Sequence, residues 1–186
     1  MNIKSSVFIA TSLDGFIANH DGNIDWLNEA SKLAPPGEDC GYQEFINSVD
    51  VLVMGRNSYK KVSGFKEWPY KEKPVVVLSS KSVPIPTKLQ KTVSSSSETP
   101  FELTRRLSDE GAKHLYIDGG ITIQRFLAAG LIDELTITVI PLLIGTGKPL
   151  FGPTQNNISL IHLETKSYDF GFVQLKYRVE KTDCHA

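Results

Sequence analysis

Residues 51–59 read Val51-Leu52-Val53-Met54-Gly55-Arg56-Asn57-Ser58-Tyr59, an apolar run that ends at a glycine and continues into polar residues. Four apolar residues before a glycine are typical of a short buried strand. Gly55 lets the backbone approach a ligand closely, and a helix beginning near Asn57 or Ser58 presents free N–H groups to a phosphate. Arg56 adds a charge-assisted donor. This segment alone leaves open an ordinary strand-to-helix turn.

A second strand-to-helix segment, Ile117-Asp118-Gly119-Gly120-Ile121-Thr122, has the same character. Its two glycines permit positive φ and remove side chains where a dinucleotide can cross. The helix that follows favours a pyrophosphate at its N-terminus. A tight turn without a ligand is the alternative.

A third apolar run, residues 75–78, ends at Ser79-Ser80-Lys81. Binders selective for NAD place an acidic residue at the ribose 2′-hydroxyl. Two hydroxyls and a lysine, together with Arg56, suit a 2′-phosphate instead and therefore predict NADP. A plain polar loop is the alternative here.

The rest of the chain alternates strand and helix patterns. Thr99-Pro100-Phe101-Glu102 predicts a helix start with a capping box, and Gly111 a helix end. The Ser94–Ser97 patch is expected to begin a loop. Alternation predicts a mainly parallel sheet with helical crossovers, closed by an antiparallel hairpin, in one domain over residues 1–186. The expected strands are 7–10, 51–54, 75–78, 114–117, 134–140, 158–165 and 173–179; the expected helices are 25–33, 42–49, one from Thr99 to Gly111, and 121–129.

The composition argues against several classes of protein. The chain has 186 residues and a net charge of −1, which does not indicate a nucleic-acid partner. It contains no apolar run long enough to span a membrane, and residues 1–11 do not resemble a signal peptide. Cys40 and Cys184 form no CxxC pair, and the four histidines have no metal-binding spacing. We therefore expect a cytoplasmic protein with reduced thiols, no metal, and no nucleic-acid or membrane partner.

These segments resemble the dihydrofolate reductase superfamily. Residues 51–59 look like its "MGR" strand-to-helix segment, Ser79-Ser80 like its serine-bearing strand end, and Asp118-Gly119-Gly120 like its double-glycine turn. The opening residues 11–18, TSLDGFIA, differ from true dihydrofolate reductases. They are similar to the "SLDGxIA" segment in the reductase domain of bifunctional riboflavin-biosynthesis deaminase/reductases, as are residues 141–151. The stand-alone relatives of that domain are the nearest match.

The resemblance implies a dihydrofolate-reductase-like three-layer α/β fold, a mostly parallel central sheet flanked by helices with a C-terminal antiparallel hairpin. It implies a homodimer, with residues 134–140 and 141–151 near the interface. It also implies an NADPH-dependent reductase of a small heterocyclic or carbonyl/imine-bearing substrate, riboflavin-precursor-like or pterin-like. A true dihydrofolate reductase and a non-catalytic NADP-binding protein are the alternatives. The expected cofactor residues are Gly55, Arg56, Asn57, Ser58, Ser79, Ser80, Lys81, Gly119, Gly120, Ile121 and Thr122.

Two aspartates are candidate catalytic acids, because reduction of a C=O or C=N group also needs a proton. Asp39 precedes Arg56 by 17 positions and resembles the pterin-binding acid of dihydrofolate reductases. Asp14 lies in the turn beside the expected nicotinamide. The alternatives are a helix N-cap for Asp39 and an Asp-Gly turn for Asp14.

Aromatic residues and a glycine-bounded segment complete the expected site. Trp26, Tyr42 and Phe45 can form a wall for a flat heterocycle, although packing into the core is the alternative for Phe45. Residues 15–22, bounded by Gly15 and Gly22, can close over the nicotinamide as a lid.

Overall fold

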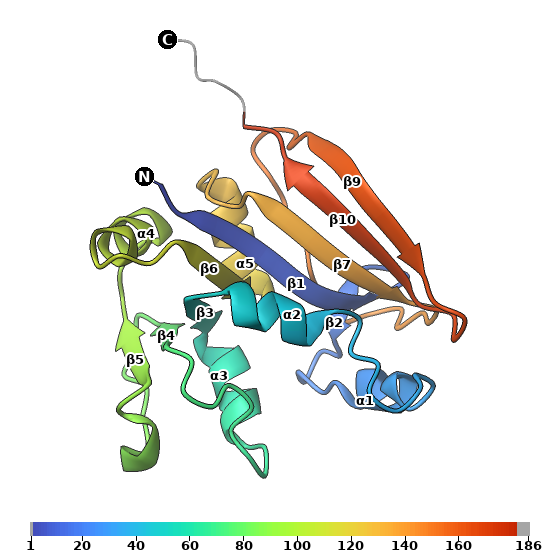
Figure 1. The fold of residues 1–186 in the computed structure, drawn as a ribbon, viewed down its shortest axis with the longest axis horizontal. Coiled ribbons are helices and arrows are strands. Elements are labelled where there is room, and N and C mark those ends of the chain that lie inside the picture. The colour runs from blue at the N-terminus through green and yellow to red at the C-terminus, as the bar shows by residue number, and fades with distance from the viewer. Residues whose placement is uncertain (1, 182–186) are drawn as a thin grey trace.

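The computed structural model describes residues 2–181, so Cys184 and His185 lie outside the described residues. An eight-stranded sheet in the order β5-β4-β3-β6-β1-β7-β10-β9 forms its centre (Figure 1). The first six strands in this order run parallel, and β10 pairs antiparallel with both β7 and β9. The strands are β1 (Lys4–Ser12), β3 (Val51–Gly55), β4 (Val75–Leu78), β5 (Val93–Ser96), β6 (His114–Asp118), β7 (Glu134–Ile140), β9 (Leu160–Ser167) and β10 (Val173–Val179).

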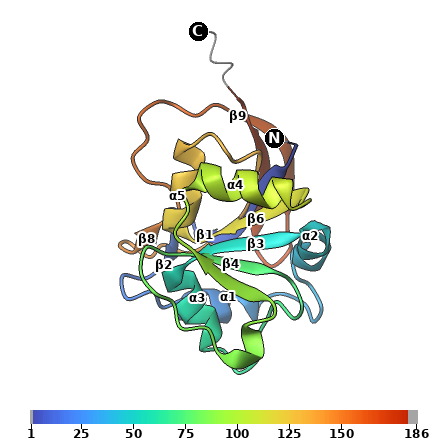
Figure 2. The same cartoon turned by 90° about the vertical axis from the view of Figure 1, so that its left-hand side faces the viewer.

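Helices cover both faces of the sheet, which makes three layers (Figures 1 and 2). On one face α4 (Pro100–Asp109) and α5 (Gly120–Ala128) pack Leu103, Leu107 and Phe126 onto the central strands. On the other face α2 (Tyr42–Ser48) and α3 (Arg56–Ser63) bury Ile46 and Tyr59 against β3 and β4. The short helix α1 (Asp25–Ser31) packs on a smaller apolar cluster, and a 3₁₀ turn, η1, spans Thr87–Leu89. The predicted fold class is confirmed.

Strands β3 and β4 consist almost entirely of apolar residues because helices cover both faces of this part of the sheet. In β3 the residues Val51–Met54 are all buried, and in β4 so are Val75–Val77. Strands of parallel sheets typically have such continuous apolar sequences, since neither of their faces is exposed to solvent. Parallel strands also end at the same side of the sheet, here called the carboxyl edge, which brings together Ser12, Gly55, Leu78, Asp118 and Ile140.

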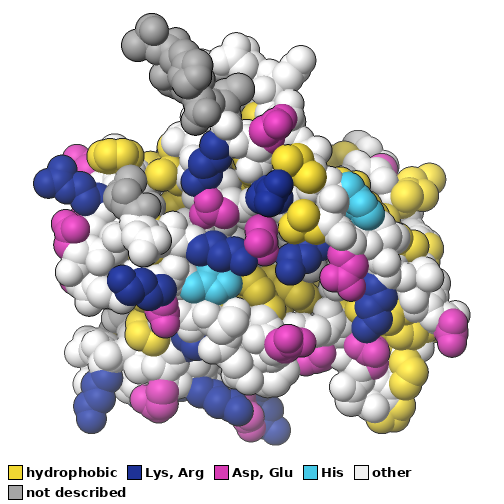
Figure 3. All heavy atoms as spheres, turned by 45° about the horizontal axis from the view of Figure 1, so that its top comes forward, with side chains coloured by type: hydrophobic (Ala, Val, Ile, Leu, Met, Phe, Trp, Pro, Cys, Tyr) yellow, Lys and Arg dark blue, Asp and Glu magenta, His cyan; other side chains and the backbone are white. Residues whose placement is uncertain are grey.

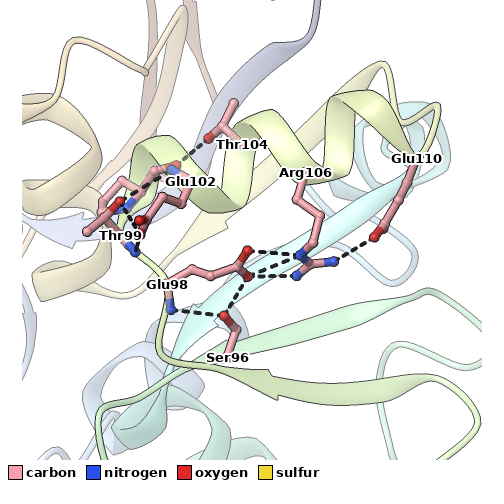
Figure 4. A network of polar contacts seen from close by, with 8 residues as sticks. Ser96, Glu98, Thr99, Glu102, Thr104, Arg106 and Glu110 are labelled. Atoms are coloured by element: carbon pink, nitrogen blue, oxygen red, sulfur yellow. Dashed lines mark hydrogen bonds and ion pairs between the residues drawn. The ribbon is translucent and has the colours of Figure 1, made fainter.

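Helix α4 begins as its sequence predicts (Figure 4). Thr99 Oγ1 accepts the Glu102 N–H at 3.3 Å, and the Glu102 carboxylate accepts the Thr99 N–H at 2.9 Å, which completes the capping box. Farther along, the Arg106 guanidinium donates to Glu98 and to Glu110, at 2.9 Å in each case. This network joins the helix to the segment that follows β5.

Three short strands, β5, β2 and β8, were not predicted from the sequence. The prediction that a loop begins at Ser94–Ser97 is wrong for the first three of these residues, because Val93–Ser96 form the edge strand β5. Val93 is buried opposite Val75 in the ladder with β4, which outweighs the weak strand preference of serine. A separate two-stranded sheet pairs β2 (Phe16–Ala18) with β8 (Lys148–Pro149).

Surface charge and helix hydropathy bear on two kinds of partner, a large charged molecule and a membrane. On the face seen in Figure 3, where the parallel strands begin, positive and negative side chains of the described residues are interspersed and form no large patch of one sign. Within residues 2–181, no helix is long and apolar enough to cross a membrane.

Candidate functional site

Two strand-to-helix turns contact each other at the carboxyl edge. A β-carbon on Gly55, at the end of β3, would lie 2.8 Å from Thr122 Oγ1 on α5. A β-carbon on Gly119, at the end of β6, would overlap Ser58 Oγ on α3. The structure therefore brings together the segments 55–58 and 119–122. These two glycines leave room for neighbouring protein atoms, a packing requirement that the sequence alone did not reveal.

Two of the helices that begin at this edge, α3 and α5, have open N-termini. Gly55 is the N-cap of α3 and Gly119 that of α5; neither helix has a side-chain cap or an acidic residue in its first turn. Helix α4 differs, since Thr99 and Glu102 cap it. The first N–H groups of a helix need a partner, and together with the helix dipole they favour an anion.

The expected 2′-phosphate residues lie beside the first turn. The register of β3 with β4 places Leu78 next to Gly55, so Ser79 follows directly along the carboxyl edge. Ser79 Oγ donates to the Lys81 carbonyl at 2.7 Å and accepts the Lys81 N–H at 3.1 Å, which forms a tight local turn. Ser80 and Lys81 are exposed. Arg56 forms no ion pair with any residue that the structure describes.

Asp118 is the acidic residue that the sequence analysis did not single out. It ends β6, paired with Met54 of β3. Burial raises the pKa of Asp118 to about 6, although the Gly119 N–H and the Tyr116 hydroxyl partly stabilise the charged form. A carboxyl group with a pKa near neutrality is suited to donate and accept protons. An acidic residue directly after three buried apolar residues was the signal available in the sequence.

The three aromatic residues expected to contact substrate have different surroundings. The pKa of Tyr42 is raised to about 12, by burial and then by the charge of Asp118, and Tyr42 packs against the buried cluster that contains Met54 and Tyr116. Phe45 instead stacks on Phe8 and meets Tyr116 edge-on, with ring centroids 4.9 and 5.0 Å apart. Trp26 packs in the cluster under α1, where its Nε1 is buried with no hydrogen-bond partner among the described residues.

Asp14 is held by hydrogen bonds. Its carboxylate accepts the Ser12 hydroxyl at 2.6 Å, the Gly145 N–H at 2.7 Å and the Ile144 N–H at 3.2 Å. These donors, Ser12 first, lower the pKa of Asp14, which is exposed. The geometry ties the turn after β1 to the loop after β7, and a catalytic role for Asp14 stays a prediction.

Asp39 lies at the start of α2. Its carboxylate accepts the Gly41 N–H at 2.9 Å and the Gln43 N–H at 2.8 Å, and the residue is exposed. The N-cap position, which was the alternative raised from the sequence for Asp39, is held by Gly41, and Asp39 reaches the N–H of Gln43 in the first turn from two residues before it. A catalytic role for Asp39 also stays a prediction.

The expected lid is paired with a second segment. Within residues 15–22, the strand β2 pairs with β8 across Phe16 and Pro149. A β-carbon on Gly120 would lie 3.0 Å from the Pro149 carbonyl oxygen and 3.1 Å from Ile17 Cδ1. The small sheet therefore lies against the double-glycine turn, and its opening and closing stay a prediction.

A surface hollow lies at the opposite edge of the sheet. It has a volume of about 480 Å³ and is bordered by the first residues of β3, β4 and β5 and by α4. Its Arg106 and Glu110 pair with each other. Ligands of open α/β sheets bind at the carboxyl edge, so the hollow is not the candidate site.

Known proteins resemble this chain over nearly its whole length. Residues 5–173 match the model of the RibD C-terminal domain family. The uncharacterized protein YwjB of Bacillus subtilis (strain 168) is 36% identical, over 95% of this chain and 98% of its own. A putative riboflavin biosynthesis protein from Shewanella sp. PV-4 superposes with a TM-score of 0.89 at 38% identity, covering 96% of this chain and 100% of that one.

A bifunctional enzyme has the same fold at lower identity. The diaminohydroxyphosphoribosylaminopyrimidine deaminase/5-amino-6-(5-phosphoribosylamino)uracil reductase of Thermotoga maritima superposes with a TM-score of 0.73 at 15% identity, over 96% of this chain and 57% of that one. The match of residues 5–173 and the two relatives above 30% identity decide the family. The chain belongs to the RibD C-terminal domain family and has the dihydrofolate-reductase-like fold of that family's reductases.

Proposed function

We propose that this protein is an NADPH-dependent reductase of a small heterocyclic or carbonyl/imine-bearing substrate, riboflavin-precursor-like or pterin-like. One observation carries the proposal: α3 and α5 begin side by side at the carboxyl edge with glycine N-caps and uncapped first turns. Two adjacent open helix N-termini suit the two phosphates of a dinucleotide. Membership of the RibD C-terminal domain family supports an oxidoreductase.

The residues at this edge fit the chemistry of NADPH. The N–H groups of Arg56, Asn57 and Ser58 at α3, and of Gly120, Ile121 and Thr122 at α5, would hold the pyrophosphate, while Gly55 and Gly119 cap the two helices. The Arg56 guanidinium, the Ser79 and Ser80 hydroxyls and the Lys81 ammonium would hold the 2′-phosphate. When bound, NADPH supplies a hydride; the protein supplies orientation and a protected pocket.

The proton comes from Asp118 in this proposal. Its pKa of about 6 keeps part of the carboxyl population protonated near neutral pH, whereas the pKa of Asp14 is lowered. Asp118 lies one residue before the double-glycine turn, and the substrate wall includes Tyr42 beside it. Asp14 then serves the site by fixing the loop at Ile144 and Gly145.

We also propose that the protein forms a homodimer. All eight residues of the edge strand β9 are exposed, including Leu160, Ile161 and Leu163. In the segment 141–151, Leu143 is 68% exposed. Exposed apolar edge strands are sites of association. Light scattering should give about twice the 20.6 kDa chain mass, and Leu163→Glu should give monomer while Thr165→Glu on the same strand does not.

The test of the reductase proposal is a calorimetric titration with NADPH and NADH. We expect micromolar NADPH binding, NADH binding at least tenfold weaker, and a loss of that preference in Arg56→Ala. Arg105→Ala, which removes an exposed arginine of α4, is the matched control and should bind as the wild type does. Absence of binding by either nucleotide overturns the proposal. Turnover of dihydrofolate in a direct assay would identify a true dihydrofolate reductase. NADPH binding without turnover of any substrate tested would identify a non-catalytic binding protein.

A further inference from the structure

The side chain of Gln124 joins α5 to the segment that contains β8. Its Nε2 amide group donates to the Pro149 carbonyl at 3.3 Å and to the Leu150 carbonyl at 3.1 Å. An amide nitrogen carries two hydrogens, so one side chain can serve both carbonyls. Within residues 2–181, these two are the hydrogen bonds that connect α5 with the segment 141–152.

Two glycines leave room for this contact. A β-carbon on Gly152 would lie 2.7 Å from Gln124 Oε1, and a β-carbon on Gly120 would lie 3.0 Å from the Pro149 carbonyl oxygen. Gly120 and Gln124 are four residues apart, so they share one face of α5 and meet the same segment. Neither glycine has a positive φ, so the close approach, and not the backbone conformation, requires glycine at these positions.

The strand β2 is placed by the same segment. It pairs with β8, and just before it the Gly15 carbonyl accepts the Leu150 N–H at 3.0 Å. Ile17 of β2 then lies against the start of α5, because its Cδ1 atom would be 3.1 Å from a β-carbon on Gly120. The position of β2 relative to the first turn of α5 therefore depends on the segment that Gln124 holds.

Other contacts of the small sheet do not replace the Gln124 amide. The Asp14 carboxylate joins the turn after β1 to residues 144–145, and neither partner belongs to α5. Leu150 is 1% exposed and lies in the core cluster that includes Phe126 of α5, but apolar packing has little directional preference. The directional contact between the small sheet and the helix comes from Gln124.

Carbonyl oxygens beside an open helix N-terminus affect how an anion binds there. The Pro149 carbonyl lies against Gly120, the first residue of α5. A carbonyl oxygen carries partial negative charge and opposes a phosphate unless a donor engages it. The Gln124 amide supplies that donor, so the helix N-terminus keeps its preference for anions.

We propose that Gln124 is a positioning residue for the cofactor: by holding residues 149–152 on the first turn of α5, it makes the β2–β8 sheet a fixed boundary of the cofactor site. The inference rests on the proposed function, which puts the NADPH pyrophosphate at α3 and α5. Gln124 acts through residues 149–152 and is not a catalytic residue. Without its amide the boundary leaves α5 for part of the time, and only the fraction with the boundary in place binds NADPH tightly.

Gln124→Met tests the role of the amide, because it keeps the length of the side chain and removes the donor. The dissociation constant for NADPH, measured by calorimetry, should rise about fivefold or more. Gln90→Met is the matched control, since Gln90 Nε2 also donates to a backbone carbonyl, that of Ile85 at 3.2 Å, in the loop before β5. It should bind NADPH as the wild type does. Unchanged affinity in Gln124→Met, or equal weakening in both variants, overturns the proposal.

Gly152→Ala displaces the same amide without changing its chemistry. The added β-carbon would lie 2.7 Å from Gln124 Oε1, so the amide must move away from the two carbonyls. This variant should also weaken NADPH binding, and the double variant with Gln124→Met should bind no more weakly than Gln124→Met alone. Fully additive losses contradict a shared contact. Should Gln124→Met not fold, Gly152→Ala still decides, and unchanged NADPH affinity in that variant overturns the proposal.

A nuclear Overhauser effect between the Ile17 δ1 methyl group and the Gly120 α protons reports the boundary directly. We expect this signal in the wild type with and without NADPH, in Gln90→Met at the same strength, and in Gln124→Met clearly weakened. A loss of stability alone would not produce this difference between the two variants. A signal that appears in the wild type only when NADPH is added would show a lid that closes on binding, and it overturns the fixed boundary.

The outcomes also separate this inference from the reductase proposal. NADPH binding by the wild type that Gln124→Met leaves unchanged retains the reductase and removes the role of Gln124. A wild type that binds neither nucleotide overturns the reductase proposal and with it the cofactor role of Gln124. In that case a signal between Ile17 and Gly120 that weakens only in Gln124→Met shows that the contact is structural.

Discussion

Ser58 on α3 occupies the space beside Gly119, so that a β-carbon on residue 119 would overlap the Ser58 Oγ atom. This contact joins α3 to the turn that starts α5 at the carboxyl edge. Gly119 also has a φ of +87°, which side chains rarely adopt. One residue thus combines a backbone requirement with a packing requirement at the candidate cofactor site.

Gly119→Ala should therefore destabilise the protein by about 2–4 kcal/mol, the sum of the positive-φ cost and the overlap. The matched control is Gly130→Ala, since Gly130 has a φ of +66° but open space around its β-carbon position. That variant should cost only about 1 kcal/mol. Urea denaturation measures both. Equal losses contradict the packing role, and adding Ser58→Ala to Gly119→Ala should recover part of the loss.

Asp118→Asn should make the protein more stable at pH 7. The pKa of Asp118 is raised to about 6 in the folded protein and lies near 3.9 in an unfolded chain. The folded state therefore holds its proton more tightly, and the wild type loses stability as the pH rises from about 4 to about 6. Removing the carboxyl group should remove this loss, worth up to about 3 kcal/mol. Thermal unfolding of both proteins between pH 4 and 8 measures it, and parallel pH curves would show that Asp118 does not titrate in this range.

Tyr168→Phe should leave stability unchanged or increase it. Tyr168 is 9% exposed, and its hydroxyl has no hydrogen-bond partner among the described residues. Tyr116→Phe is the contrasting variant, because the Tyr116 hydroxyl donates to the Phe8 carbonyl at 2.8 Å. Losing that bond should cost about 1 kcal/mol. A larger loss in Tyr168→Phe than in Tyr116→Phe would show that the Tyr168 hydroxyl has a partner.

The sequence predicts those features that depend on local pattern. The strand Glu134–Ile140 has the bounds expected from its apolar run, and the capping box at Thr99 forms as predicted. Features that depend on contacts between distant segments could not be predicted from the sequence. The strand β5 forms because Val93 finds a buried position beside β4, and the pKa of Asp118 rises because other elements enclose it. The donors that hold Asp14 at Ile144 and Gly145 are about 130 residues away.

Thr99→Ala should destabilise the protein by about 1 kcal/mol, since it removes the hydroxyl that caps α4. Thr99→Ser keeps that hydroxyl and is the matched control, expected within about 0.5 kcal/mol of the wild type. Chemical denaturation compares the two. NADPH binding should be the same in both variants, because the proposed cofactor residues lie on α3, on α5 and at the end of β4, and a changed affinity would place α4 in the cofactor site.

Asp14→Asn should loosen the loop after β7. The Asp14 carboxylate accepts the N–H groups of Ile144 and Gly145, and an amide with one oxygen can replace only part of these bonds. Hydrogen exchange at these two amides should become at least tenfold faster. The pKa of Asp14 is lowered, chiefly by the Ser12 hydroxyl. The stabilisation is therefore present above the unfolded pKa near 4 and is lost as the pH falls through the lower folded value.

Asp39→Asn is the comparison that separates the two aspartates. It keeps an oxygen for the helix cap and should leave exchange at Ile144 and Gly145 unchanged. If Asp14 acts by positioning the loop, Asp14→Asn should raise KM for a substrate more than it lowers kcat, and the pH dependence of kcat should keep the apparent pKa near 6 that Asp118 supplies. Loss of that apparent pKa in Asp14→Asn, with normal exchange of the loop amides, would assign proton transfer to Asp14 instead of Asp118.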